Sequence, residues 1–271
     1  MPYRIPAAWT RLAWLSTVLM ALASWVGVFV EGVYAKEAPS WATQGVGQDL
    51  ANLFVVLPVM AGAALLAGRG SFRAVLVLVG TLLYVVYSYV LYAFFMHFGP
   101  WFPVYVATLG CAFFALAGLA AHLVRDDLSA WFGARVPVRT PSAFLMIVGV
   151  TFAMLWLGEI VPALVAGRAP ASVEDVGLPV NPVHVLDLAL VLPGMMATSV
   201  MLGRRRPAGY LFTVPMLVFS AVMGVAIEAM AAMMALRDIA VPPPMIVVVA
   251  GVTLGSLALV VLFLRRVGDG A

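Results

Sequence analysis

Two short segments of the sequence, residues 49–58 and 184–193, share a pattern that could do chemistry inside a helix. Each segment begins with two polar residues three positions apart and continues through an apolar run to a proline. The polar pairs are Asp49 with Asn52 and His184 with Asp187. Side chains three positions apart share one face of a helix. Carboxylate and imidazole groups on such faces can hold a proton or ligate a cation, so the pattern indicates two related halves that build a polar site.

The composition places this site in a membrane. Of the 271 residues, 64% are hydrophobic and 10% are charged, and the mean hydropathy is +1.08. Such a chain has too little polar surface for a water-soluble domain of this size. The basic residues behind the net charge of +3 are scattered among short connections, which argues against a nucleic-acid partner. The sequence therefore predicts an integral membrane protein whose main partner is the lipid bilayer.

The apolar stretches predict the number and direction of the membrane spans. Stretches of about 20 residues, the length that crosses the hydrocarbon, can be placed eight times. We expect spans at residues 12–34, 49–68, 72–98, 101–124, 142–166, 183–203, 207–236 and 243–264. All basic residues except Lys36, Arg168 and Arg237 then fall on the side of the two termini. By the positive-inside rule, both termini face the cytoplasm.

The longest connection on the side of the termini, residues 125–141, separates a first half, residues 1–124, from a second half, residues 142–271. Each half holds four predicted spans, an even number, so both halves enter the membrane in the same direction. The sequence therefore predicts an all-α membrane protein of two parallel four-helix repeats.

The polar residues of the predicted spans lie toward the side opposite the termini. A charge at the centre of the bilayer costs about 2.5–3.5 kcal/mol, so each such group must be paired, protonated, hydrated or bound to a metal. When Pro58 is aligned with Pro193, the polar groups of the two halves form two sets of four. The first set is Glu31, Asp49, Asn52 and Tyr92, and the second is Glu159, His184, Asp187 and Glu228. His97, at the end of the third predicted span, is a further candidate ligand.

Two further features concern the helices that carry these groups. Pro58 and Pro193 lie within their predicted helices, where each removes one backbone hydrogen bond and favours a kink. Tyr84 and Tyr87 lie too deep in the third span to be interface anchors, so we expect them to form hydrogen bonds within the bundle.

Three functions remain open at this point. The polar groups could form an outward-facing site that binds or transports a small cation or a proton, with or without a solute, and this is the function that we expect. They could instead hold a divalent metal ion in a membrane-embedded enzyme, although the sequence has no phosphate-binding loop, nucleophile elbow or H-E-x-x-H motif. They could also form a structural network that only locks the bundle. Gly251 and Gly255, four positions apart, fit a close helix contact within the chain or in a homo-oligomer.

Three segments carry a resemblance to a known family. They are Trp156–Pro162, Asn181–Asp187 and Tyr87–Tyr92. In these segments the chain resembles a family of uncharacterised bacterial polytopic membrane proteins. The resemblance implies a multi-pass protein of the bacterial inner membrane, and it implies no catalytic role because the family has no assigned activity.

Overall fold

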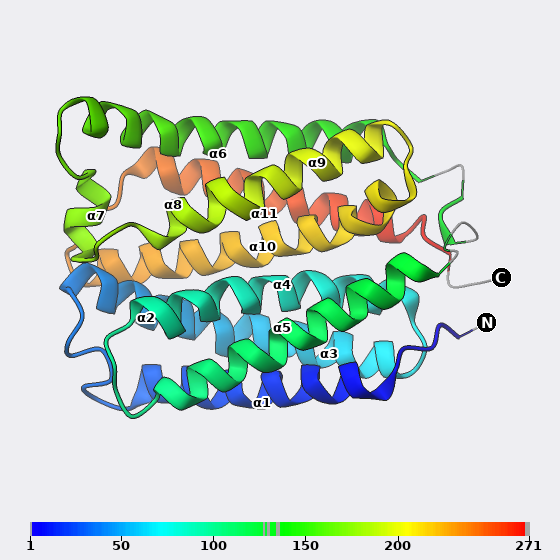
Figure 1. Ribbon diagram of the computed structural model, residues 1–271, viewed down its shortest axis with the longest axis horizontal. Helices are drawn as coiled ribbons and strands as arrows, with labels where there is room; N and C mark the ends of the chain where they lie inside the picture. Colours follow the sequence, from blue (N-terminus) through cyan, green and yellow to red (C-terminus); the bar gives the residue numbers. More distant parts are fainter. Residues whose placement is uncertain (1, 127, 129–130, 134–135, 269–271) are drawn as a thin grey trace.

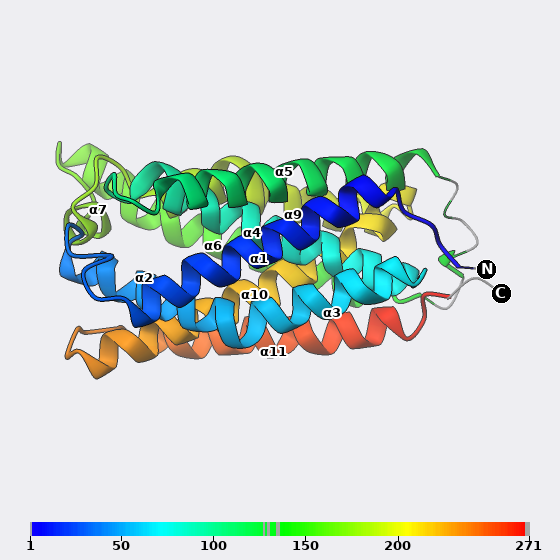
Figure 2. The same cartoon turned by 90° about the horizontal axis from the view of Figure 1, so that it is seen from below.

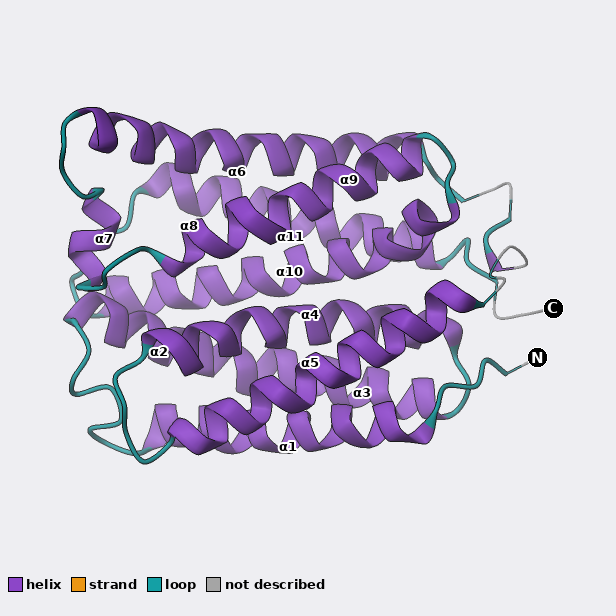
Figure 3. Cartoon of the chain, viewed as in Figure 1, coloured by secondary structure: helices purple, strands orange, loops and turns teal. Residues whose placement is uncertain are grey.

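The computed structural model describes residues 2–126, 128, 131–133 and 136–268, and this part of the chain is helical and forms no strand (Figure 3). The helices run along the long axis of the molecule, and both termini lie at one end, here called the terminal end (Figure 1). The opposite end, which carries the loops 30–38, 96–101, 166–181 and 237–242, is the distal end. The elements are α1 (Ala7–Phe29), α2 (Pro39–Ala51), η1 (Asn52–Val56), α3 (Leu57–Gly68), α4 (Phe72–Phe95), α5 (Phe102–Arg125), α6 (Arg139–Val165), α7 (Ala171–Val176), α8 (Pro182–Leu186), η3 (Asp187–Val191), α9 (Leu192–Gly203), α10 (Pro207–Leu236) and α11 (Pro243–Leu264).

Within the described residues, eight helical segments are long and apolar enough to cross a membrane. Two of them are composite. The first joins α2, η1 and α3 over Pro39–Gly68, and the second joins α8, η3 and α9 over Pro182–Gly203. The all-α fold and the expected number of membrane-length helices are confirmed, and these helices indicate an integral membrane protein in contact with lipid.

Three predicted boundaries at the distal end are wrong. The first helix ends at Phe29, not at residue 34, because Val30 is extended and Gly32 turns the chain with a φ of 81°. Glu31 therefore lies exposed in a loop and not within a span. The third long helix ends at Phe95, so His97 is also in a loop. The second long helix begins at Pro39 and not at residue 49, since proline suits a first helical turn, where its missing N–H is not needed.

α4 lies at the centre of the bundle. It packs against α3, α5 and α10, and most of its side chains are buried. α10 also packs against α2, α9 and α11, so the contact between α4 and α10 joins the first four long helices to the last four. Figure 2 shows α1 and α5 running side by side, and they too are in contact. At Gly80 of α4 an added Cβ would lie 2.6 Å from the carbonyl oxygen of Pro215, which shows how closely α10 approaches.

The terminal end is covered by aromatic side chains. Tyr3, Phe72, Trp131 and Phe132 form a chain of ring contacts with centroids 4.6–5.9 Å apart. The Tyr3 hydroxyl also donates to Asp126 Oδ2 at 2.8 Å. Residues 127, 129–130 and 134–135 of the predicted connection lie outside the described residues. The described part of the connection packs onto the bundle and covers the ends of the helices.

The two glycines of the last long helix differ in their surroundings. A Cβ at Gly255 would lie 2.7 Å from Phe144 Cε2 of α6, so this close contact lies within the chain. A Cβ at Gly251 would meet open space. The homo-oligomer stays a prediction.

The close approach of α4 and α10 makes Gly80→Ala a test of the packing. We expect the variant to lose about 1–3 kcal/mol of unfolding free energy, because the methyl group would meet backbone atoms of α10. The control is Gly110→Ala in α5, where a Cβ meets open space and the better helix propensity of alanine should stabilise the protein slightly. Denaturation in detergent measures both, and equal stability of the two variants would contradict the packing.

Candidate functional site

The two sequence segments adopt matching irregular backbones. η1 (Asn52–Val56) and η3 (Asp187–Val191) are π-helical turns, and each begins at the second polar residue of its pair. Each ends two residues before a proline, Pro58 or Pro193, which cannot donate a backbone hydrogen bond. Such turns widen a helix and occur often at functional sites. The sequence predicts a lost backbone hydrogen bond and a kink at each proline, and the structure has a π-helical turn ahead of each.

The segments that follow also correspond, at the same separation along the sequence. α3 ends at Gly68 and α9 at Gly203, and the next helices begin at Phe72 and Pro207. The turns between them share their backbone hydrogen bonds. Ser71 N donates to Leu66 O in the first turn, and Arg206 N donates to Met201 O in the second.

Asp49 is the most deeply buried carboxylate among the candidates, with 1% of its surface exposed. Tyr92 of α4 donates to its Oδ1 at 2.9 Å, and Tyr34 of the loop after α1 donates to its Oδ2. Two glycines make room for Tyr34. A Cβ at Gly27 would overlap Asp49 Oδ2 and lie 2.7 Å from the Tyr34 hydroxyl, and a Cβ at Gly45 would lie 3.2 Å from the Tyr34 ring.

Asn52 continues this group toward the middle of the bundle. Its side-chain nitrogen donates to Ser24 Oγ of α1 at 3.1 Å, and its oxygen accepts from the Tyr84 hydroxyl of α4 at 2.9 Å. All three side chains are at most 1% exposed. We call Ser24, Tyr34, Asp49, Asn52, Tyr84 and Tyr92 the first cluster. A buried polar group costs free energy unless it is hydrogen-bonded, and this cluster meets that requirement with side chains from four segments.

Tyr34 lies in the loop after α1, outside the long helices. Burial, and then the neighbouring Asp49 and Tyr105, raise the pKa of its hydroxyl well above the usual value. The phenol is therefore protonated at neutral pH and acts as the donor to Asp49.

Asp187 has an equivalent setting in the second half of the chain. Tyr87 of α4 donates to its Oδ1 at 3.1 Å, and the Trp156 indole of α6 donates to its Oδ2 at 2.8 Å. Asn52 and Asp187 thus occupy the same place in their segments, and each contacts α4 and the preceding long helix. Tyr84 and Tyr87 form the hydrogen bonds within the bundle that the sequence predicts.

His184 and Glu159 lie next to Asp187. His184 Nε2 is 3.5 Å from Glu159 Oε2, and the His184 ring lies on Trp156 with centroids 4.9 Å apart. Glu159 Oε1 accepts from the backbone N–H of Ser172 at 3.0 Å. Within the described residues, His184 Nε2 and Ser172 Oγ are buried without a hydrogen-bond partner. These atoms offer unused hydrogen-bonding capacity around one carboxylate. We call Trp156, Glu159, Ser172, His184 and Asp187, with Tyr87, the second cluster.

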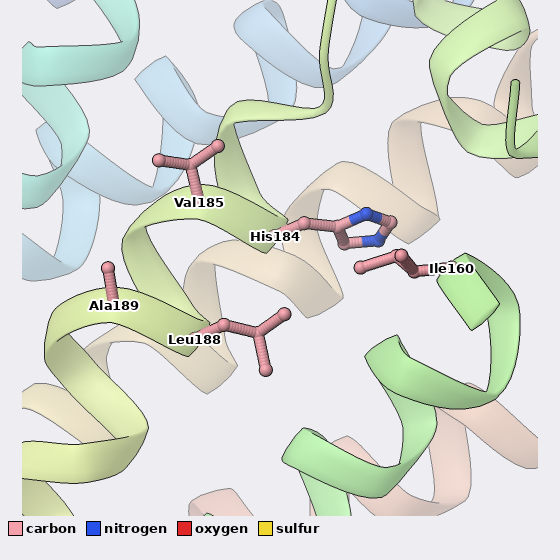
Figure 4. A pocket seen from close by; sticks show the side chains of 5 residues that line it. All are labelled: Ile160, His184, Val185, Leu188 and Ala189. Carbon is pink, nitrogen blue, oxygen red and sulfur yellow. The ribbon is translucent and has the colours of Figure 1, made fainter. Parts of the chain in front are cut away.

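His184 of the second cluster lies at a shallow, open hollow between α6 and the α8–η3 segment, lined also by Ile160, Val185, Leu188 and Ala189. Figure 4 shows His184 and Leu188 pointing toward Ile160 of α6, whereas Val185 points away from it. The lining is mainly apolar, so His184 is the polar group that this hollow reaches.

The remaining candidates lie elsewhere. Glu228 of α10 accepts from Thr253 Oγ1 of α11 at 3.0 Å. His97 contacts Glu37 in the distal loops, through its backbone N–H at 2.7 Å and its ring Nδ1 at 2.9 Å. Glu31 lines a cavity beside this pair. By their contacts, the nine predicted site residues therefore form four groups and not one shared pocket.

Several residues of the clusters were not among the sequence candidates. Ser24, Tyr34 and Trp156 carry no spacing pattern that marks them, and Tyr34 comes from a segment expected to continue the first span. Gly27 and Gly45, which make room for its ring, are a signal that becomes meaningful only when α1 and α2 are known to be neighbours.

The metal prediction remains open. Within the part of the chain that the structure describes, no three histidine, cysteine, aspartate or glutamate side chains come together as ligands. Glu159 and His184 are a close pair, whereas protein zinc sites generally use three or four protein ligands.

In comparisons with known proteins, no family model, curated protein or solved structure matches the chain. The function is therefore argued from the contacts described above.

The buried hydrogen bond between Tyr84 and Asn52 can be tested by a double-mutant cycle. We expect Tyr84→Phe to lower the unfolding free energy by about 0.5–2 kcal/mol, because it leaves the Asn52 oxygen without its donor. In an Asn52→Ala background the same change should cost less. Equal costs in the two backgrounds, measured by denaturation in mixed micelles, would contradict the contact.

Proposed function

We propose that the protein is a multi-pass protein of the bacterial inner membrane that binds and transports protons or a small cation through its buried carboxylates. The chain is proposed to consist of two parallel four-helix repeats, with both termini in the cytoplasm and the distal end outside. The matching π-helical turns and the matching turns at Gly68 and Gly203 support the repeat. Basic residues concentrated at the terminal end support the orientation.

One observation carries the functional proposal. Asp49 and Asp187 lie in separate membrane-length helices, and each accepts a hydrogen bond from a tyrosine of the central helix α4. A carboxylate placed in hydrocarbon has a large free-energy cost, and phenol and indole donors can stabilise either its charged form or a proton shared with it. Groups of this kind serve as proton or cation sites in membrane transporters.

The second cluster supports the same function by different means. His184 Nε2 lies 3.5 Å from Glu159 Oε2, too far for a good direct hydrogen bond but close enough for one small cation to contact both atoms. Imidazole also changes its charge near neutral pH more readily than any other side chain. We therefore propose that Glu159, His184 and Asp187 together bind a proton or a small cation.

Proton flux in liposomes tests the proposed function. We expect purified protein in liposomes to dissipate an imposed pH gradient, and Asp49→Asn and Asp187→Asn to lower the rate about tenfold or more, because asparagine cannot bind the transferred proton. A pH-sensitive dye inside the liposomes reports the rate. The control is Glu174→Gln, which neutralises an exposed acid of α7 outside both clusters.

Two outcomes would contradict the proposal. One is a rate equal to that of empty liposomes for the native protein under gradients of protons and of small cations. The other is a native rate in both asparagine variants with lowered thermal stability, which is the behaviour of a network that only locks the bundle. Elemental analysis of the same preparation tests the metal hypothesis, which requires about one bound transition metal ion per chain.

A further inference from the structure

A cavity of about 240 Å³ lies at the distal end above the first cluster. Besides Tyr34, its wall includes the loop residues Glu31, Lys36, Glu37 and His97, which carry acidic or basic side chains. The Glu37 side chain is 4% exposed and contacts His97, whereas the His97 side chain is 55% exposed. Lys36 Nζ donates to the carbonyl of Phe98 at 3.0 Å. The cavity thus combines polar groups with access to the surface, so water can enter it.

Tyr34 belongs to both the cavity and the first cluster. It lines the cavity together with Tyr105, and its hydroxyl donates to Asp49. Tyr34 therefore contacts both the cavity and the carboxylate, and Gly27 and Gly45, which lack side chains, make room for its ring. Tyr34 is 8% exposed and Asp49 is 1% exposed, so the phenol lies between the two environments.

The surroundings of Asp49 hold one further polar atom without a partner. Tyr89 of α4 stacks on Tyr92 with ring centroids 5.2 Å apart, and within the described residues its hydroxyl is buried with no hydrogen-bond partner. Tyr105 lies 5.2 Å from Tyr92 by the same measure. The hydrogen-bonding groups next to Asp49 are neutral hydroxyls and the Asn52 amide, whereas the charged side chains line the cavity.

We propose that the distal cavity is the proton entry site of the protein and that the Tyr34 hydroxyl is the group that connects it to Asp49. This inference rests on the proposed function, in which Asp49 binds a proton. It assigns to that site a route and a gating residue.

The transfer step is balanced. A hydronium ion in the cavity gives a proton to Tyr34 Oη while the proton of that hydroxyl passes to Asp49 Oδ2. One O–H bond forms and one breaks at Tyr34, so the phenol is neutral before and after, the hydronium becomes water, and Asp49 becomes neutral. The direct contact between Tyr34 and Asp49 is the geometry that such a step requires.

Hydrogen–deuterium exchange at Asp49 tests the route without any gradient. The protonated carboxyl of Asp49 is identified in the infrared spectrum of the full-length protein in lipid vesicles as the band that Asp49→Asn removes. Its exchange rate in D₂O is then compared among variants. Tyr34→Phe keeps the ring and removes the hydroxyl. Tyr34→Ala also removes the ring and leaves space for water between the cavity and Asp49. Tyr3→Phe is the matched control, since it removes a phenol–carboxylate bond at the terminal end.

We expect Tyr34→Phe to slow exchange at Asp49 about tenfold or more, Tyr34→Ala to accelerate it, and Tyr3→Phe to leave it unchanged. Equal rates in the native protein and Tyr34→Phe would overturn the route, as would equal slowing in Tyr3→Phe. The lack of an Asp49 carboxyl band at every pH would also overturn it. If Asp49→Asn lowers proton flux but Tyr34→Phe does not change exchange at Asp49, the proposed function stands and the route is overturned. If exchange at Asp49 depends on Tyr34 but the protein carries no proton flux, the route stands and the proposed transport function is overturned.

Discussion

The structure depends on how carboxylates and amides are stabilised inside helices that are otherwise apolar. α4 provides tyrosine hydroxyls as hydrogen-bond donors to both polar segments. Tyr84 and Tyr92 reach Asn52 and Asp49, and Tyr87 reaches Asp187. Because an unpaired polar group in such a position costs several kcal/mol, the placement of α4 between the two polar segments is a condition for their burial. The most buried long helix is thus the one that supplies a tyrosine donor to each of these three polar side chains.

The two clusters differ in how completely their buried polar atoms are hydrogen-bonded. In the first cluster, short contacts among buried side chains satisfy Asp49 and Asn52, and Tyr34 covers them from the distal side. In the second cluster, His184 and Ser172 keep buried polar atoms without partners next to Glu159. The polar groups of Asp49 and Asn52 are therefore paired within the first cluster, whereas the second cluster keeps unused hydrogen-bonding capacity.

The fold was predictable from the sequence where a single physical constraint acts. Length and hydropathy define the membrane-length helices, and the bounds 207–236 and 243–264 agree with α10 and α11 because proline begins both helices. The distal loops were not predictable in this way. The apolar run of the first helix extends to Val30 and Val33 follows soon after, so the pattern favoured a longer helix. Gly32 and the burial of Tyr34 against Asp49 decide where the chain turns.

The candidate site was predictable only in its parts. The repeated polar pairs indicate which residues face inward, and Asp49, Asn52 and Asp187 do so. The sequence does not contain the distances between helices, so the convergence of Glu228 and Glu31 with the others could not be judged. Glu228 lies against Thr253, and Glu31 lies in a loop. Partners such as Trp156 and Ser24 depend on helix packing and have no local signature.

An infrared pH titration of the protein in lipid vesicles tests the central claim most directly, because it observes the buried carboxyls themselves. The account predicts two carboxyl bands that appear and vanish with pH. One should be absent in Asp49→Asn and shifted in Tyr92→Phe, and the other absent in Asp187→Asn and shifted in Tyr87→Phe. Bands that do not respond to pH, or that ignore the loss of these hydroxyls, would contradict it.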